Sequence, residues 1–239
     1  MRIAIVGYGK MGKAIESLAR EANHEIAFII DADNASDIAK ITPQNTDVAI
    51  EFSQPSTAYQ NIKTLVSNGV TTMVGTTGWL DKYTEITNLC KANNGTFLYA
   101  SNYSIGVNLF FELNKWLAEK MAKLGGFDIE MEEIHHTEKK DAPSGTAITL
   151  AEGVLEKNSK VSGWINEPTE DSSTIGIVSL REPEVPGTHT INYKSAMESI
   201  EIKHTAHDRK VFASGVIKVA EWITNQSGIV TMEDFIKQS

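Results

Sequence analysis

The chain has 239 residues, a formal net charge of −9, 41% hydrophobic residues and 22% charged residues. This composition is that of a globular protein of one or two domains, and it excludes the disordered and fibrous classes. The acidic balance makes nucleic acid a poor partner, and no apolar run reaches membrane-spanning length. We expect a cytoplasmic protein, because the single cysteine, Cys90, allows no internal disulfide and the N-terminus lacks a signal-peptide pattern.

In the first part of the chain, short β-branched apolar runs alternate with helical patterns, as they do in βαβ units. The predicted strands are Arg2–Val6, Glu25–Ile30, Asp47–Phe52, Thr71–Val74 and Thr96–Ala100. The predicted helices are Met11–Ala22, Pro55–Asn68, which Ser53 would cap, and Asp81–Asn93. Because the strands are continuously apolar, we expect a parallel sheet that is covered on both faces. Cys90 shares a helix side with Ile86 and Leu89, which predicts a small buried side chain rather than a catalytic thiol.

A long helix is predicted at Gly106–Lys123, and its apolar residues fall on one stripe that we expect to be a packing surface. The pattern of predicted elements changes after this helix. The stripe consists of Leu109, Phe110, Leu113, Trp116, Leu117 and Met121. The elements predicted next are the strand Phe127–His136, with Phe127, Ile129 and Met131 on one face, the helix Ser144–Glu156 and the loop Lys157–Ser173. Antiparallel strands are predicted at Thr174–Leu180, His189–Tyr193 and Ser199–His204, and helices at Val211–Asn225 and Met232–Ile236. The middle region is therefore α+β.

A glycine-rich hexapeptide follows the first predicted strand and opens the first helix. Its residues are Gly7, Tyr8, Gly9, Lys10, Met11 and Gly12, which gives the spacing G-x-G-x-x-G. Glycines at these positions allow a tight turn, close approach of the backbone to a pyrophosphate and close helix–strand packing. Asp31 ends the second strand, where a carboxylate can accept hydrogen bonds from a ribose 2′-OH. The context and the spacing together favour a dinucleotide site over an ordinary turn with a solvated aspartate.

Asp31 also bears on the choice between NADH and NADPH. A carboxylate at this position repels a 2′-phosphate, and the next residue, Ala32, offers no compensating arginine. Lys10 or Lys13 could still supply positive charge. We expect NADH to be used at least as well as NADPH.

Two further loops follow predicted parallel strands, and the carboxyl ends of such strands face the ligand crevice of the fold. They are Gly75-Thr76-Thr77-Gly78 and Ser101-Asn102-Tyr103-Ser104. Taken alone, each is better explained as an ordinary turn.

The segment from Glu133 to Ala147 concentrates chemically active side chains between a predicted strand and a helix. It holds His135, His136, Lys139 and a Ser-Gly-Thr helix start that includes Gly145 and Thr146. Histidine donates protons near neutral pH, a lysine ammonium can hold a carboxylate, and a helix N-terminus binds anions through free N–H groups. The alternative is a pair of surface histidines before a capped helix, and the spacing alone does not decide between the two.

We predict no metal site. Neighbouring residues on a strand point to opposite sides, so His135 and His136 are poorly placed to share an ion. His204 and His207 lack further ligands nearby and are predicted to be solvated. His189 can face either the site or the solvent.

The segment His135-His136, Lys139 and Asp141-Ala142-Pro143-Ser144-Gly145-Thr146-Ala147 resembles the signature of the 4-hydroxy-tetrahydrodipicolinate reductase family. The glycine loop, Gly75-Thr76-Thr77 and Asn102-Tyr103-Ser104-Ile105-Gly106-Val107-Asn108 fall in the family's order, so the resemblance covers essentially the whole chain. The chain differs from many members of the family in its shorter glycine loop, which contains Lys10. It also has Ala32 where those members carry arginine.

The resemblance implies an α/β fold with a Rossmann-type parallel sheet and an inserted α+β domain for substrate binding and oligomerisation. Residues 1–102 and 214–239 would form the dinucleotide domain, and residues 103–213 the insert. Family members are usually homotetramers joined through sheets of the insert. The implied reaction is the NADH- or NADPH-dependent reduction of 4-hydroxy-tetrahydrodipicolinate (dihydrodipicolinate), a small cyclic dicarboxylate, to tetrahydrodipicolinate in lysine and diaminopimelate biosynthesis.

The resemblance also assigns roles to residues of this sequence. His135 would donate the proton, with Lys139 as the second acid or electrostatic residue. His136, Gly145 and Thr146 would bind the substrate. The residues that would touch the dinucleotide, besides the glycine loop and Asp31, are Gly75, Thr76, Thr77, Ala100, Ser101, Asn102 and Tyr103.

Two other functions compete with this one. A related Rossmann dehydrogenase acting on an amino acid or a semialdehyde would lack the paired histidines before Ser-Gly-Thr. A nucleotide-sensing regulatory or scaffold protein would bind NADH without turning anything over.

Overall fold

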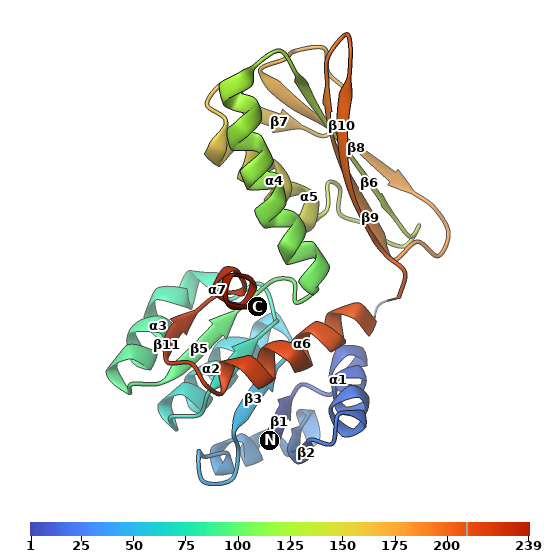
Figure 1. The fold of residues 1–239 in the computed structure, drawn as a ribbon. Coiled ribbons are helices and arrows are strands. Elements are labelled where there is room, and N and C mark those ends of the chain that lie inside the picture. Colours follow the sequence, from blue (N-terminus) through green and yellow to red (C-terminus); the bar gives the residue numbers. More distant parts are fainter. Residues whose placement is uncertain (209) are drawn as a thin grey trace. The chain divides into compact units, whose positions relative to one another are not determined.

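The computed structural model describes residues 1–208 and 210–239, which form two compact units (Figure 1). Unit 1 comprises Met1–Ile105 and Lys210–Ser239, and unit 2 comprises Gly106–Arg209. The chain thus leaves and re-enters unit 1 a few residues away from the boundaries expected at 103 and 213. The physical reason is that Tyr103 and Ala213 are both buried in the core of unit 1.

Unit 1 is built on a six-stranded, fully parallel sheet with the order β11-β5-β4-β3-β1-β2. Its strands are β1 (Arg2–Val6), β2 (Glu25–Ile30), β3 (Val48–Glu51), β4 (Thr72–Val74), β5 (Thr96–Tyr99) and β11 (Gly228–Val230). The sequence analysis predicts the first five strands but misses β11, which lies between two predicted helices without a βαβ pattern of its own. The strand order reverses between β1 and β3, and ligands of open α/β sheets bind at such a point.

Helices cover both faces of this sheet, as the continuous apolar strands require. One face packs against α1 (Lys10–Glu21), α6 (Lys210–Ile223) and α7 (Met232–Gln238), and the other against α2 (Pro55–Ser67) and α3 (Tyr83–Ala92). The 3₁₀ segments are η1 (Ala32–Lys40) and η2 (Leu80–Lys82). Cys90 is fully buried beside Ile86 in α3, as predicted.

Unit 2 has a five-stranded mixed sheet with the order β10-β9-β6-β8-β7, and α4 and α5 pack on one face of it. Its strands are β6 (Asp128–His135), β7 (Gly163–Ile165), β8 (Thr174–Arg181), β9 (Gly187–Lys194) and β10 (Ser199–Ala206). Its helices are α4 (Ile105–Leu124) and α5 (Gly145–Lys157). The core joins Ile129 and Met131 to Phe110 and Leu150 across this layer.

Three local expectations are wrong in unit 2. β8 is parallel to both β6 and β7, because α5 carries the chain back over the sheet before β8 begins. The antiparallel pairs are β9 with β6 and β9 with β10. The loop predicted at residues 157–173 contains β7, which is paired with β8. In the apolar stripe of α4, Phe110, Leu117 and Met121 are buried, whereas Leu109, Leu113 and Trp116 are exposed, because the sheet contacts only one side of this helix.

A smaller correction concerns the start of α2. Ser53 does not cap it: Gln54 occupies the cap position, and the Ser53 hydroxyl bonds to the Glu51 carboxylate instead. None of the helices in the described part of the chain is long and apolar enough to cross a bilayer.

Candidate active site

The glycine loop of unit 1 is packed tightly at its first and third glycines and is open at its second. Gly7 has a φ of +96°, its N–H donates to the Ile30 carbonyl at 2.8 Å, and a Cβ at Gly7 would lie 2.2 Å from the Phe52 oxygen. A Cβ at Gly12 would lie 2.2 Å from the Gly7 oxygen, whereas one at Gly9 would meet no atom of the described residues within 4 Å. The loop therefore leaves free space at Gly9, where a pyrophosphate needs close approach to the backbone.

Two cavities in unit 1 share Gly9, Phe52 and Ser53. One, of about 360 Å³, brings Asp31 together with Gly7, Tyr8 and Gly9. The other, of about 340 Å³, joins residues 9–11 to residues 75–77. Both lie at the carboxyl ends of the parallel strands, and their linings fit a dinucleotide. When bound, this cofactor supplies the hydride.

Several of the other residues predicted to bind the cofactor also make contacts that stabilise the fold. Asp31 caps η1 by accepting the Ala32 N–H at 2.9 Å, and the Tyr8 hydroxyl donates to the Glu16 carboxylate. Ala100 and Tyr103 are buried, while Ser101 is exposed and Asn102 half-buried. The Tyr103 hydroxyl donates to the Val74 carbonyl at 2.9 Å, and its ring packs on Phe52 with centroids 5.8 Å apart. Tyr103 therefore supports the sheet beneath the cavities.

Sequence reasoning missed the contribution of residues 51–53. The Phe52 ring fills the space against Gly75, where a Cβ would lie 2.1 Å from it, and the Phe52 oxygen packs against Gly7. Glu51 is fully buried and bonds to Ser53, and its Oε2 has no hydrogen-bond partner among the described residues. Burial raises the pKa of Glu51 above its usual range. A carboxylate at the end of an apolar strand is the one sequence signal that points to this cluster.

In unit 2, His135 lies at the end of β6 beside a buried carboxylate. Its Nδ1 is 2.7 Å from Oε2 of Glu133, which is fully buried on the same face of the strand. Burial alone would raise the pKa of Glu133, but the polar contacts with His135, Ser144 and Ser179 together outweigh it and hold this pKa well below its usual range. Glu133 is therefore ionised, and it forms an ion pair with the imidazole of His135 when that ring is protonated.

Arg181 and His189 complete this cluster, and the sequence analysis assigned no role to Arg181. Arg181 donates from both terminal nitrogens to Oε1 of Glu133, at 3.2 Å each. His189, which the sequence left open, is buried and faces the cluster: its Nε2 lies 3.0 Å from the Ser144 hydroxyl, and its ring is edge-on to that of His135. Because Ser144 caps α5 by accepting the Ala147 N–H, His189 connects the cluster to the helix start.

The remaining predicted residues surround this cluster. Lys139 forms an ion pair with Asp141 at 2.7 Å, and its N–H donates to the carbonyl of half-buried His136 in the turn after β6. Gly145 and Thr146 are the first residues of α5, so their N–H groups have no partner within the helix. The positive end of this helix suits a carboxylate.

Glu133, His135 and His189 also satisfy the simplest geometric test for a metal site, with ligand atoms within 4.8 Å of one another. Arg181, however, already supplies positive charge to Glu133, and His135 approaches the same carboxylate at the distance of an ion pair. These two cationic partners balance the charge of Glu133 without an ion. His204, predicted to be solvated, stacks on Phe110 instead.

The buried His189 predicts that the folded state loses stability in mild acid. Burial and, next, the charge of His135 lower the pKa of His189 from 6.5 to about 3. Between these values the unfolded chain binds the proton and the folded protein does not, so stability falls as pH falls. From pH 6.5 to pH 5 this group removes roughly 2 kcal/mol of unfolding free energy. Urea denaturation at both pH values measures the loss, and His189→Asn should flatten the slope; an unchanged slope in that variant contradicts the assignment.

The parallel sheet of unit 1, with its glycine loop after β1, is a Rossmann domain that binds NAD(P), and it places the protein among the NAD(P)-dependent oxidoreductases. Two family descriptions match adjoining parts of the chain: "Dihydrodipicolinate reductase, N-terminus" over residues 1–103 and "Dihydrodipicolinate reductase, C-terminus" over residues 106–236. The chain belongs to the dihydrodipicolinate reductase family, whose members act in lysine and diaminopimelate biosynthesis.

Individual relatives agree with this membership. The chain is 46% identical to 4-hydroxy-tetrahydrodipicolinate reductase of Christiangramia forsetii over 99% of its own length and 98% of the relative's. The enzyme of the same name from Methanoculleus marisnigri is 36% identical over 83% and 79% of the two chains. Among solved structures, dipicolinate-bound dihydrodipicolinate reductase from Paenisporosarcina sp. TG-14 has a TM-score of 0.79 at 24% identity, covering 97% of each chain, which shows a shared fold. The family favours the reductase over the semialdehyde dehydrogenase and the nucleotide sensor.

Proposed function

We propose that unit 1 binds NADH or NADPH through the glycine loop, Asp31 and the loops after β4 and β5, while unit 2 binds the cyclic dicarboxylate. The substrate carries a hydroxyl group, so water leaves it to give a conjugated ring. The reaction then adds a hydride and a proton across an unsaturated bond of that ring. The protein must therefore supply one proton from a group of suitable acidity and hold two carboxylates.

His135 is proposed as the proton donor. The observation that carries this role is its 2.7 Å contact, through Nδ1, with the ionised and buried Glu133. The carboxylate stabilises the protonated imidazole and fixes the ring, which leaves Nε2 to give its proton to the substrate. Glu133 then holds the neutral ring in place until it is protonated again by solvent.

Lys139 and the start of α5 are proposed to bind the substrate carboxylates. The N–H groups of Gly145 and Thr146 offer two donors at the positive end of a helix, and His136 precedes them in the segment between β6 and α5. Lys139 exchanges its exposed partner Asp141 for a substrate carboxylate, and its charge stabilises negative charge that develops in the ring.

A coupled assay tests this function most directly. The synthase that precedes this step in the lysine pathway generates the substrate in the assay mixture, and the decrease of NADH absorbance reports turnover. Substrate-dependent oxidation of NADH is the expected result. A protein that binds NADH without oxidising it would contradict the proposal.

Asp31 is proposed to favour NADH over NADPH, because its carboxylate repels a 2′-phosphate. Asp31→Asn removes the charge and keeps an oxygen that can accept the Ala32 N–H. We expect the ratio of kcat/KM for NADPH to that for NADH to rise about tenfold, the effect of roughly 1.4 kcal/mol of like-charge repulsion. Steady-state kinetics with both cofactors measure this, and a wild-type enzyme with a hundredfold preference for NADPH would contradict it.

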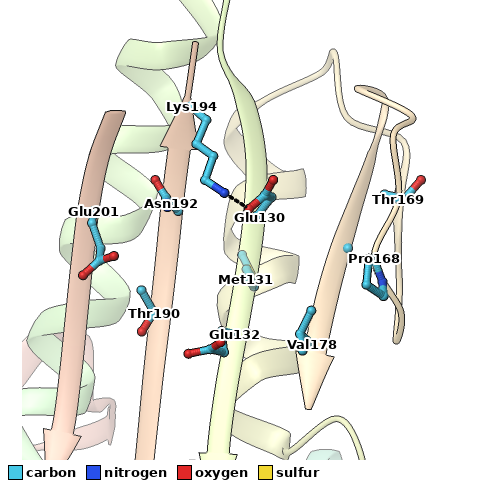
Figure 2. A pocket seen from close by; sticks show the side chains of 11 residues that line it. Glu130, Met131, Glu132, Pro168, Thr169, Val178, Thr190, Asn192, Lys194 and Glu201 are labelled. Carbon is cyan, nitrogen blue, oxygen red and sulfur yellow. Dashed lines mark hydrogen bonds and ion pairs between the residues drawn. The ribbon is translucent and has the colours of Figure 1, made fainter. Parts of the chain in front are cut away.

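The face of the unit 2 sheet opposite α4 and α5 is proposed to join copies of the chain into a homotetramer. Figure 2 shows polar side chains over a cavity of about 290 Å³ on this sheet, with Lys194 paired to Glu130 and with Glu132, Thr190, Asn192 and Glu201 beside them. Light scattering should give four times the chain mass, and a monomer would contradict it.

We also propose a cytoplasmic location, which suits a protein whose single cysteine is buried and free.

A further inference from the structure

The Arg181 side chain connects the separate parts of the proposed substrate site. Besides its two bonds to Glu133, it donates from Nη2 to the carbonyl of Asp141 at 2.6 Å and from Nε to the carbonyl of Lys139 at 3.3 Å. Its Cα is paired with that of His135 across the β6–β8 register, so strand pairing sets its position. One guanidinium therefore contacts both the carboxylate behind His135 and the main chain that carries Lys139.

Glu133 divides its two oxygens between these partners. Oε1 accepts from Arg181, and Oε2 faces Nδ1 of His135. A fully buried carboxylate needs a compensating charge and hydrogen bonds to remain ionised, and Arg181, with a side chain that is 20% exposed, supplies both. Without it, Glu133 would hold His135 less firmly.

We propose that Arg181 is a positioning residue for the proton-transfer step: it fixes the Glu133–His135 pair and the Lys139–Asp141 main chain at the same time. This inference rests on the proposed function of His135. Arg181 itself need not touch the substrate, and its effect passes through Glu133 and through the two carbonyls.

The planar fork of arginine is central to this role. Its nitrogens reach a carboxylate and two carbonyls in fixed directions, whereas a lysine at the same place would supply charge with a single, movable ammonium. Arg181→Lys therefore keeps the charge near Glu133 and gives up the bonds to the Lys139 and Asp141 carbonyls. Arg181→Met removes both contributions while keeping a long side chain.

The test compares these two variants with Lys123→Met, which removes an exposed charge paired with Glu119 on α4. We expect Arg181→Lys to lower kcat by about 10-fold and Arg181→Met by up to about 100-fold, with the KM for NADH changed less than about twofold. Lys123→Met should behave as wild type. Thermal unfolding and circular dichroism establish that each variant is folded, and if Arg181→Met does not fold, Arg181→Lys decides the question.

Two further readouts separate positioning from simple loss of folded enzyme. A solvent deuterium isotope effect on kcat should increase in Arg181→Lys, because proton transfer becomes the slow step; a smaller folded fraction would leave it unchanged. In a double-mutant cycle, Arg181→Met should cost much less in a Glu133→Gln background, since both changes break one chain of contacts.

The inference fails if Arg181→Lys keeps wild-type kcat and isotope effect, or if the two substitutions are additive. His135→Gln serves as the reference for the function on which it rests. If His135→Gln is inactive while Arg181→Lys is fully active, only the role of Arg181 is wrong. If His135→Gln keeps its kcat, His135 is not the proton donor, and the error lies in the proposed function rather than in the contacts of Arg181.

Discussion

His135→Gln should lower kcat by about 10²- to 10⁴-fold, which is the usual contribution of a positioned general acid. Glutamine keeps a polar side chain of similar reach and can still bond to Glu133, so the buried carboxylate is not left unpaired. Glutamine cannot donate a proton to the substrate near neutral pH. The KM values for substrate and cofactor should change little, because the loss occurs in the transition state alone.

Steady-state kinetics with the synthase-coupled assay measure this effect, and His136→Gln is the matched control. His136 follows β6 in the turn and lies outside the Glu133 contact, so its substitution should raise the substrate KM more than it lowers kcat. A His135→Gln enzyme that retains its kcat would end the proton-donor assignment, provided that thermal unfolding shows an intact fold.

Gly9→Val should abolish useful NADH binding without destabilising the protein. No atom of residues 1–208 and 210–239 lies within 4 Å of a Cβ at this position, so there is room for the side chain. The same space is where the pyrophosphate must approach the backbone, and the added methyl groups would occupy it. We expect the Kd for NADH to rise by more than about 100-fold, equivalent to at least ~2.8 kcal/mol, while Tm stays near the wild-type value.

Gly12→Val provides the contrasting case in the same loop. Its Cβ would lie 2.2 Å from the Gly7 oxygen, which no ordinary packing allows, so α1 must move away from the strand. This variant should lose both NADH binding and thermal stability. Fluorescence titration with NADH and thermal unfolding distinguish the two variants. Wild-type NADH affinity in Gly9→Val would place the pyrophosphate elsewhere.

The amino-acid sequence by itself determined the elements of unit 1 up to β5. Continuous β-branched runs, the glycine loop and Asp31 depend on local patterns, because a parallel strand that is covered on both faces is apolar along its whole length. The same is true of β6, whose alternation places Ile129 and Met131 on the buried face. Continuing this alternation by two steps reaches Glu133 and His135, so the buried acid beside the proposed proton donor was within reach of the sequence.

Only the tertiary structure decided which distant residues meet. Arg181 reaches Glu133 because β8 is parallel to β6 in a register that pairs it with His135, and His189 faces the cluster because β9 lies on the other side of the same strand. Strand order and register depend on long-range pairing, and a single sequence carries no local signal for either. For the same reason the structure alone showed that Phe52 fills the space between Gly7 and Gly75, and that one side of α4 remains exposed.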